Sequence, residues 1–242
     1  MSNINPLNLL LAFLLLAVVI LGSAQYLFPR PVNSTEGFAR FIRQNPQLIA
    51  ESLENYYSSG AAPVVPNTLL RESHAALYND KNIPILGNSS NKKVIVEFFD
   101  YQCGYCKKAN MILMDIHQEH PDITIILHPY PVLSDFSMYL SQVALAVYHL
   151  YGQERFLEVH TRFLNPQAPA LRNKDDIANA LEALKIKDWE KEAEKKKYKT
   201  ILENSIQLGT QLHFSGVPTF IINDQLYSGL LEKSTLLSKL SS

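Results

Sequence analysis

Apolar residues follow two different periods along this chain, and the change of period separates strands from helices. Val94 to Phe99 is an almost continuous apolar run, which is typical of a strand buried on both faces. Ile123 to Leu127 repeats this pattern, and Ile83 to Leu86 is a shorter candidate. Thr219 to Ile222 and Gln225 to Ser228 flank a short Asn-Asp turn. The two segments therefore predict a hairpin.

Helical periods occupy most of the sequence between these strands. A helix-compatible segment runs from Lys107 to about His117, and residues 134–212 predict several consecutive helices. Within that stretch, the charged residues 189–197 are interpreted as a solvated helix face with Glu192 and Lys196 paired. The order strand, helix, strand, inserted helices, hairpin and final helix predicts an α/β fold.

The N-terminal segment is a run of apolar residues. Leu7 to Leu21 is almost wholly apolar, and small residues lead to Ala24, where a secretory signal peptide could be cleaved. Counted on to Phe28, the run has about 20 residues, enough for an uncleaved membrane anchor. Residues 1–24 are therefore a signal peptide, or residues 7–28 are a membrane tether. Both alternatives predict an exported protein.

Residues 25–80 predict a helical extension before the main domain. Its apolar residues recur at helical spacing in two stripes, at Phe38, Phe41 and Ile42 and at Ile49, Leu53 and Tyr56. Apolar stripes of this kind must be buried against a partner surface. Two alternatives are open: self-association into a homodimer or homotrimer, or packing onto the protein's own residues 81–242.

Composition narrows the possible functions only slightly. The chain is 47% hydrophobic and 19% charged, with a formal net charge of −1. No basic stripe interrupts this balance, which argues against nucleic acid as a partner. The length allows one full domain plus an accessory segment.

The two cysteines carry the clearest chemical signal. Cys103 and Cys106 are the only cysteines in 242 residues, and two residues separate them. The first turn of a helix brings sulfurs at this spacing within bonding distance. A disulfide closing so short a loop restricts the unfolded chain only weakly, so it would stabilise the fold little. The pair is therefore interpreted as redox-active.

Their order along the chain predicts different roles. At the start of a helix, Cys103 would meet unpaired backbone N–H groups and the positive end of the helix dipole, which favour the thiolate. Lys107 in the next turn adds charge of the same sign. Cys106 lies one turn deeper, where it can attack a mixed disulfide and release the substrate. Cys103 is predicted to attack and Cys106 to resolve.

Glu97 is an acidic residue within the predicted central strand. It shares one face with Ile95 and Phe99, and the opposite face is apolar as well. A buried carboxylate is costly unless it is paired, neutral or used. The hypothesis is that Glu97 exchanges protons with Cys106. The alternative, an edge-strand residue facing solvent, does not fit flanking residues that lack strand alternation.

Two alternatives concern histidines. Cys103, Cys106, His117 and His120 form a superficially zinc-like string, but finger-type sites use longer histidine spacings and the chain needs no metal for its core. No metal and no diffusible cofactor are therefore expected. His128, at the end of the third apolar run, is interpreted as structural, with tuning of the thiolate as the alternative.

Three motifs in order carry a family resemblance. VEFFDYQCGYCKK, then YPVLSDFS, then FSGVPTFIIND resemble the DsbA family of bacterial periplasmic thiol:disulfide oxidoreductases, over residues 83–240. Among its members, the chain is most similar to the ScsC-type subgroup, which has an added N-terminal helical segment. The resemblance implies a periplasmic protein with a thioredoxin fold over residues 81–242 and a helical insertion at about 134–212.

The resemblance also implies site residues. Val217–Pro218 would be a cis peptide bond beside the cysteines, and Gly216, Val217 and Pro218 would offer backbone groups to an extended substrate chain. Glu97 stands six residues before the first cysteine, where the family has a buried acid. Strongly oxidising members carry Pro-His between the cysteines. This chain has Gly104 and Tyr105 there, so an extreme oxidising potential is not expected.

The sequence thus predicts an exported thiol:disulfide oxidoreductase that forms, isomerises or reduces disulfides in other exported proteins. Its partners would be cysteine-containing substrates and a membrane redox partner that supplies either an oxidant or electrons. The direction of electron flow is open. The alternative is a non-catalytic, chaperone-like binding protein whose two cysteines form a structural disulfide.

Overall fold

The computed structural model describes residues 35–58 and 67–241, and the chain divides into two compact units between Glu54 and Asn55. The predicted signal or anchor segment, residues 1–24, lies outside the described residues. No helix in the described ranges is long and apolar enough to cross a membrane.

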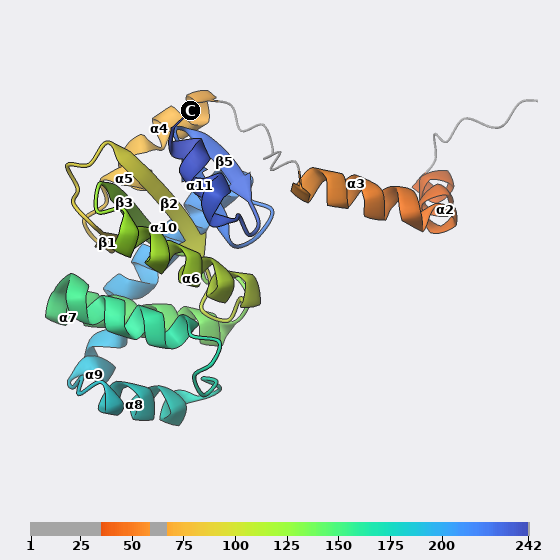
Figure 1. The fold of residues 1–242 in the computed structure, drawn as a ribbon. Helices are drawn as coiled ribbons and strands as arrows, with labels where there is room; N and C mark the ends of the chain where they lie inside the picture. Colours follow the sequence, from red (N-terminus) through yellow and green to blue (C-terminus); the bar gives the residue numbers. More distant parts are fainter. Residues whose placement is uncertain (1–34, 59–66, 242) are drawn as a thin grey trace, which may run out of the picture. The chain divides into compact units, whose positions relative to one another are not determined.

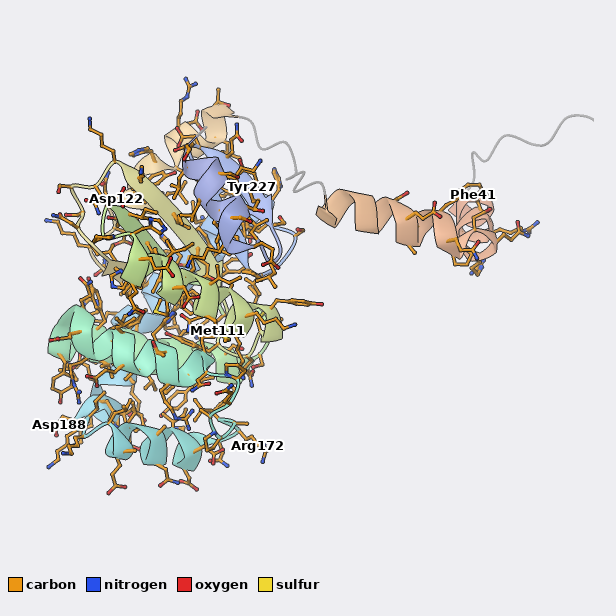
Figure 2. The ribbon with its side chains drawn as sticks, in the orientation of Figure 1. Phe41, Met111, Asp122, Arg172, Asp188 and Tyr227 are labelled. Carbon is orange, nitrogen blue, oxygen red and sulfur yellow. The ribbon has the colours of Figure 1, made fainter. Side chains whose placement is uncertain are left out.

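Two helices begin the described chain, α2 (Thr35–Gln44) and α3 (Pro46–Ser58). Asn45 separates them: its backbone N–H and its side-chain Nδ2 both donate to the carbonyl oxygen of Phe41, at 3.0 and 2.9 Å. Proline suits the first position of the second helix because its missing N–H would be unpaired there. Phe41, labelled in Figure 2, is exposed on α2, and Leu48 and Ile49 are exposed on α3. This segment thus presents apolar side chains at its surface.

The second unit is built around one mixed five-stranded sheet (Figure 1). Its strands are β1 (Ile85–Leu86), β2 (Lys93–Phe99), β3 (Ile123–Pro129), β4 (Thr219–Ile222) and β5 (Gln225–Ser228). Their order is β1-β3-β2-β4-β5, with β2 parallel to β3 and the other pairs antiparallel. The continuous apolar run predicted a central strand, and β2 is one. Asn223 and Asp224 both have positive φ, as a tight hairpin turn requires.

Helices cover both faces of the sheet. The face of Ile95 and Phe99 belongs to the larger core cluster, with α6 (Gly104–Glu119), α7 (Asp135–Leu164) and α11 (Lys233–Leu240). The face of Val96 and Phe98 forms the second cluster, with α4 (Asn67–Glu72), α5 (His74–Tyr78) and α10 (Lys196–Gln211). Leu70 of α4 and Leu77 of α5 are buried in this second cluster. These two helices, in the predicted 25–80 extension, therefore pack onto the main domain.

The inserted helices include α7, α8 (Lys174–Ala183) and α9 (Trp189–Ala193); in Figure 1, α7 lies beside α6, and α8 and α9 lie on the far side of α7. Gly152 interrupts α7 with φ 82° and ψ −172°, a conformation essentially restricted to glycine. The segments on either side are two of the consecutive helices predicted over residues 134–212.

One expected pair differs in the structure. Glu192 does not pair with Lys196 on a solvated face. It is 9% exposed, and its carboxylate accepts hydrogen bonds from Lys195, Lys197 and the Tyr198 hydroxyl. The helix ends at Ala193, so the helical spacing on which the predicted pair depended is broken there.

Candidate active site

Cys103 is placed at the junction of strand and helix. β2 ends at Phe99, a short turn follows, and Cys103 is the N-cap of α6 with extended backbone angles. Its sulfur accepts the backbone N–H of Cys106 at 3.2 Å, so it takes the role of a capping side chain. Cys103 is 7% exposed, which leaves part of its surface open to an incoming substrate.

The local hydrogen bonds favour the Cys103 thiolate. The pKa of Cys103 is lowered from 9.0 to about 6, chiefly by a hydrogen bond from the Cys106 side chain. Backbone N–H groups of Cys106 and Tyr105 act in the same direction, whereas burial and the charge of Asp100 oppose them. A pKa of about 6 leaves this cysteine largely ionised at neutral pH, and the thiolate is the nucleophile.

Cys106 has the opposite properties. It is fully buried, and its pKa is raised above 9.0, first by burial, then by its hydrogen bond to Cys103 and by the charge of Glu97. Cys106 therefore holds its proton while Cys103 is ionised. The two thiols thus differ in exposure and in acidity.

Glu97 is fully buried in the middle of the sheet, between Leu127 of β3 and Phe220 of β4. Among the described residues, neither of its carboxylate oxygens has a hydrogen-bond partner. Burial raises its pKa from 4.5 to about 8, and the charge of Cys103 adds to the increase. The sequence pattern predicts a buried acid at this position, and Glu97 is buried. Such a group can gain or lose a proton near neutral pH.

The segment before β4 lies against Cys103. The Val217–Pro218 bond is cis, as the family resemblance implied. The Cys103 sulfur lies 3.5 Å from the carbonyl oxygen of Val217, which accepts a hydrogen bond from the thiol when Cys103 is protonated. A cavity of about 560 Å³ opens beside this contact, lined by Tyr105, Ser215, Gly216, Val217, Pro218, Ser228, Gly229 and Leu230. The structure thus brings residues 216–218 together with the cysteine helix.

The residues between and after the cysteines are exposed to different degrees. Gly104 has no neighbouring atom within 4 Å of where a side chain would begin, so close packing does not require glycine there. The Tyr105 side chain is 62% exposed, and Lys108 Nζ lies 5.6 Å from its ring centre. The Lys107 backbone N–H donates to the Cys103 carbonyl oxygen at 3.2 Å.

Sequence reasoning missed a buried aromatic and histidine group beside the turn. The Tyr101 hydroxyl lies 3.1 Å from Nδ1 of His160, and both residues are buried. Burial lowers the pKa of His160 from 6.5 to about 3, so its ring is neutral. Because these residues are 59 positions apart, no local pattern could have paired them.

His128 lies on the other face of the sheet from Glu97. It stacks on Phe98, and its Nε2 lies 3.0 Å from the carbonyl oxygen of Leu77. Burial lowers its pKa from 6.5 to about 4. His128 therefore joins β3 to α5, as the structural interpretation expected. Across residues 35–58 and 67–241, no three His, Cys, Asp or Glu side chains are grouped to bind a metal ion.

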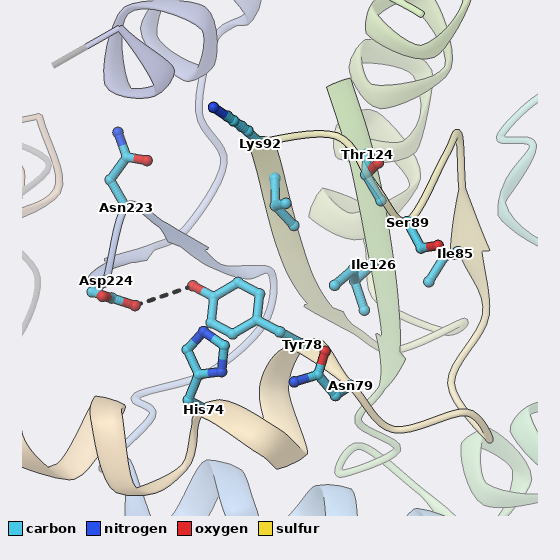
Figure 3. A pocket seen from close by; sticks show the side chains of 11 residues that line it. His74, Tyr78, Asn79, Ile85, Ser89, Lys92, Thr124, Ile126, Asn223 and Asp224 are labelled. Carbon is cyan, nitrogen blue, oxygen red and sulfur yellow. Dashed lines mark hydrogen bonds between the residues drawn. The ribbon is translucent and has the colours of Figure 1, made fainter. Parts of the chain in front are cut away.

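A second cavity of about 340 Å³ lies at the start of β2 (Figure 3). Lys92 and Val94 line it, together with His74 and Tyr78 of α5. Figure 3 shows the Tyr78 hydroxyl directed at Asp224, at 3.5 Å. The cysteines follow the opposite end of this strand, so this cavity is separate from the candidate redox site.

Together, a CxxC pair at a helix start, a cis-proline beside it and a β1-β3-β2-β4-β5 sheet define a thioredoxin-fold protein with a dithiol site. The family model described as thioredoxin matches residues 79–241, and the chain belongs to this family. No curated protein sequence matches the chain.

Solved structures extend this comparison. The catalytic domain of Proteus mirabilis ScsC is 27% identical, with a TM-score of 0.66 over 73% of this chain and 99% of that one. A periplasmic thioredoxin-like protein from Salmonella enterica serovar Typhimurium is 27% identical, with a TM-score of 0.61 over 74% of this chain and 100% of that one.

The thiol-disulfide exchange protein alpha-DsbA2 from Wolbachia pipientis shares the fold, at 23% identity and a TM-score of 0.66 over 72% of this chain and 94% of that one. The family match and the two more similar structures support thiol:disulfide oxidoreductase chemistry in general.

Proposed function

We propose that this protein is an exported thiol:disulfide oxidoreductase that forms, isomerises or reduces disulfides in other exported proteins. The observation that carries the proposal is the opposed state of the two thiols. Cys103 is acidic and partly accessible, whereas Cys106 is fully buried and retains its proton. One sulfur can therefore meet a substrate while the other waits within the fold.

In the reduced protein, exchange with a substrate disulfide takes place in two steps. The Cys103 thiolate attacks a substrate disulfide, a mixed disulfide forms, and one substrate sulfur leaves as a thiolate. Cys106 then loses its proton and attacks Cys103, which closes the Cys103–Cys106 disulfide and releases the second substrate thiolate. Two electrons pass to the substrate. The reverse sequence oxidises a substrate dithiol.

Glu97 is the proposed acceptor of the Cys106 proton. With a pKa of about 8, a fraction of Glu97 is ionised near neutral pH, and that carboxylate can accept the Cys106 proton and later return it. The charge of Glu97 also raises the pKa of Cys106. The raised pKa of Cys106 makes such a base necessary, because its thiol is otherwise a poor nucleophile.

Gly216, Val217 and Pro218 are proposed to dock the substrate. They line the cavity beside Cys103, together with the exposed Tyr105. An extended peptide laid along this segment would bring its cysteine close to the Cys103 sulfur.

Export and partners are further parts of the proposal. The apolar N-terminal run and the similarity to a periplasmic thioredoxin-like protein support export to the periplasm. A membrane oxidant or electron donor would then keep Cys103 and Cys106 in one redox state. The exposed apolar residues of α2 and α3 support a homodimer or homotrimer.

A Cys106→Ser variant tests the proposal directly. Removing the resolving thiol should leave substrates attached to Cys103 as mixed disulfides, visible as larger species on non-reducing gels of exported proteins. Cys103→Ser is the matched control, because it keeps one thiol but removes the accessible one, and it should trap almost nothing. If Cys106→Ser traps no protein, the non-catalytic binding function is favoured.

The direction of exchange requires a separate measurement. The redox state of Cys103 and Cys106 in cells can be preserved with acid and determined by alkylation with a mass tag. A mostly oxidised pair indicates a disulfide donor served by a membrane oxidant. A mostly reduced pair indicates an isomerase or reductase supplied with electrons.

A further inference from the structure

The turn between β2 and α6 contains a buried acid, Asp100, that the chemistry above does not use. Asp100 is fully buried, and both of its carboxylate oxygens accept hydrogen bonds from backbone N–H groups. Oδ1 accepts the N–H of Gln102 at 2.8 Å, and Oδ2 accepts the N–H groups of Val132 and Leu133, both at 3.0 Å. A buried carboxylate needs such charge-assisted hydrogen bonds to be tolerated.

Asp100 joins two segments that are distant in sequence. Its carbonyl oxygen accepts the N–H of Cys103 at 3.0 Å, so it is also part of the redox turn. The Val132 and Leu133 side chains are 43% and 54% exposed, while their N–H groups are turned inward to Asp100. This carboxylate therefore holds the 130–133 loop against the turn that carries Cys103.

Gln102 adds a second connection of the same kind. Its Oε1 accepts hydroxyl hydrogen bonds from Ser134 and Ser137, at the start of α7. The residue next to Cys103 is thus tied to the residues that follow the 130–133 loop. Together with Asp100, this fixes the redox turn against the entry to the inserted helices.

The charge of Asp100 acts on Cys103 as well. It opposes the thiolate, whereas the hydrogen bonds from Cys106 and Tyr105 favour it. Glu97, which also acts on the cysteines, is held largely neutral by burial, and Lys107 and Lys108 follow on α6. Asp100 is therefore an acidic side chain that works against the ionised sulfur.

We propose that Asp100 is a positioning residue of the redox site: its carboxylate holds the 130–133 loop against the turn that carries Cys103, and its charge limits the stability of the Cys103 thiolate. This inference rests on the proposed function.

Reduction with glutathione measures how strongly the charge of Asp100 limits the stability of the Cys103 thiolate. Two glutathione thiols supply two electrons, the Cys103–Cys106 bond breaks and glutathione disulfide forms; Cys106 takes one of the two thiol protons, the other passes to the solvent, and Cys103 remains a thiolate.

The test compares Asp100→Asn with Asp122→Asn in the full chain. Both variants remove one carboxylate. Asp122, however, is exposed at the start of β3 (Figure 2), where it pairs with Lys93 at 2.8 Å. Cys103 alkylation by iodoacetamide is followed from about pH 4 to pH 9. In Asp100→Asn the midpoint should fall by about half a pKa unit, so that alkylation at about pH 5 is roughly threefold faster.

The redox equilibrium with glutathione should also change, because a more stable thiolate favours the reduced protein. Asp100→Asn should favour the reduced protein by about threefold, because the thiolate belongs to the reduced form. Asp122→Asn should match the unchanged protein in both measurements. If Asp100→Asn behaves as Asp122→Asn does, the inference is overturned. A midpoint near 9 in the unchanged protein would instead contradict the proposed function.

Hydrogen exchange tests the positioning role without a variant. In the reduced, unchanged protein, the amides of Val132 and Leu133 should exchange at least about tenfold more slowly than unprotected loop amides, although both side chains are exposed. In Asp100→Asn they should exchange faster, because asparagine offers one acceptor oxygen and turns its NH2 group toward a donor. Unprotected rates in the unchanged protein would overturn the inference even where Asp100→Asn fails to fold.

Discussion

At the scale of single residues, hydrogen bonding and burial shift the pKa values of three ionisable groups in opposite directions, although these groups lie close together in the chain. Cys103 becomes more acidic because it receives hydrogen bonds, whereas Cys106 and Glu97 become less acidic because they are buried. The same desolvation that raises the pKa of Cys106 also raises that of its proposed proton acceptor. Proton transfer between them therefore remains feasible near neutral pH.

Replacing Glu97 by glutamine should slow exchange and alter stability. Without the carboxylate, resolution by Cys106 should be at least about tenfold slower, measured by stopped-flow reaction with a disulfide peptide. In the native fold Glu97 holds its proton up to about pH 8, whereas in the unfolded chain it ionises near 4.5. Its contribution to stability is therefore fully present below 4.5 and is lost as pH rises toward 8.

Urea unfolding of the reduced protein checks that pH dependence. At about pH 8, Glu97→Gln should be more stable than the unchanged protein by ~1–3 kcal/mol, and at about pH 5 the difference should largely vanish. Glu119→Gln is the control, because Glu119 is exposed on α6 and pairs with Lys233 at 2.7 Å. Unchanged exchange rates in Glu97→Gln would exclude the proton-transfer role.

At the scale of elements, α10 packs closely against the 130–133 loop that follows β3. Tyr130 follows β3, its backbone N–H donates to the Phe99 carbonyl oxygen at 2.7 Å, and its ring packs against Phe214. Gly209 of α10 lies directly beneath these rings. A Cβ at this position would lie 2.7 Å from Phe214 Cδ2 and would also overlap the Tyr130 ring. The helix thus approaches closely because this residue has no side chain.

Gly209→Ala is therefore expected to destabilise the protein. The higher helix propensity of alanine would contribute up to about 1 kcal/mol, but displacing two packed rings costs about 1–3 kcal/mol. We expect a net loss of about 1–2 kcal/mol in thermal or urea unfolding. Gln207→Ala, at an exposed position of the same helix, should change stability by less than about 0.5 kcal/mol. Equal stability of the two variants would show that the rings relax without cost.

At the scale of the whole molecule, the chain combines a thioredoxin-family domain with a helical segment that exposes Phe41, Leu48 and Ile49. Exposed apolar residues on short helices are typical of surfaces that associate. The contrast with α4 and α5, whose Leu70 and Leu77 are buried against the sheet, sets residues 35–58 apart as the candidate association segment.

Deleting residues 25–66 should therefore yield a monomer in sedimentation velocity, while the exchange activity of the remaining domain toward small peptides is retained. A double variant, Phe41→Ser on α2 with Leu48→Ser on α3, should weaken association in the full chain. The control Gln47→Ser, also on α3, should not. If the deletion variant sediments as the same oligomer as the intact protein, residues 25–66 do not mediate association.

Local sequence determined the arrangement along the chain. The almost continuous apolar run predicted β2 as central, the missing strand alternation predicted a buried Glu97, and the cysteine spacing placed Cys103 at a helix start. Each of these follows from covalent spacing and from one or two turns of regular structure. The paired Asn223 and Asp224 with positive φ were likewise predictable from turn chemistry.

Tertiary structure decided which distant groups meet. Asp100 binds the amides of Val132 and Leu133, 32 and 33 positions away, and Tyr101 meets His160. The sequence pattern carries no record of these pairs, because a buried polar group accepts any partner that packing brings within reach. Val217, next to Cys103 in space, was located only through a family resemblance. Periodicity thus determined the elements, and cysteine spacing determined the redox pair. Packing determined the contacts that set the acidity of the two thiols.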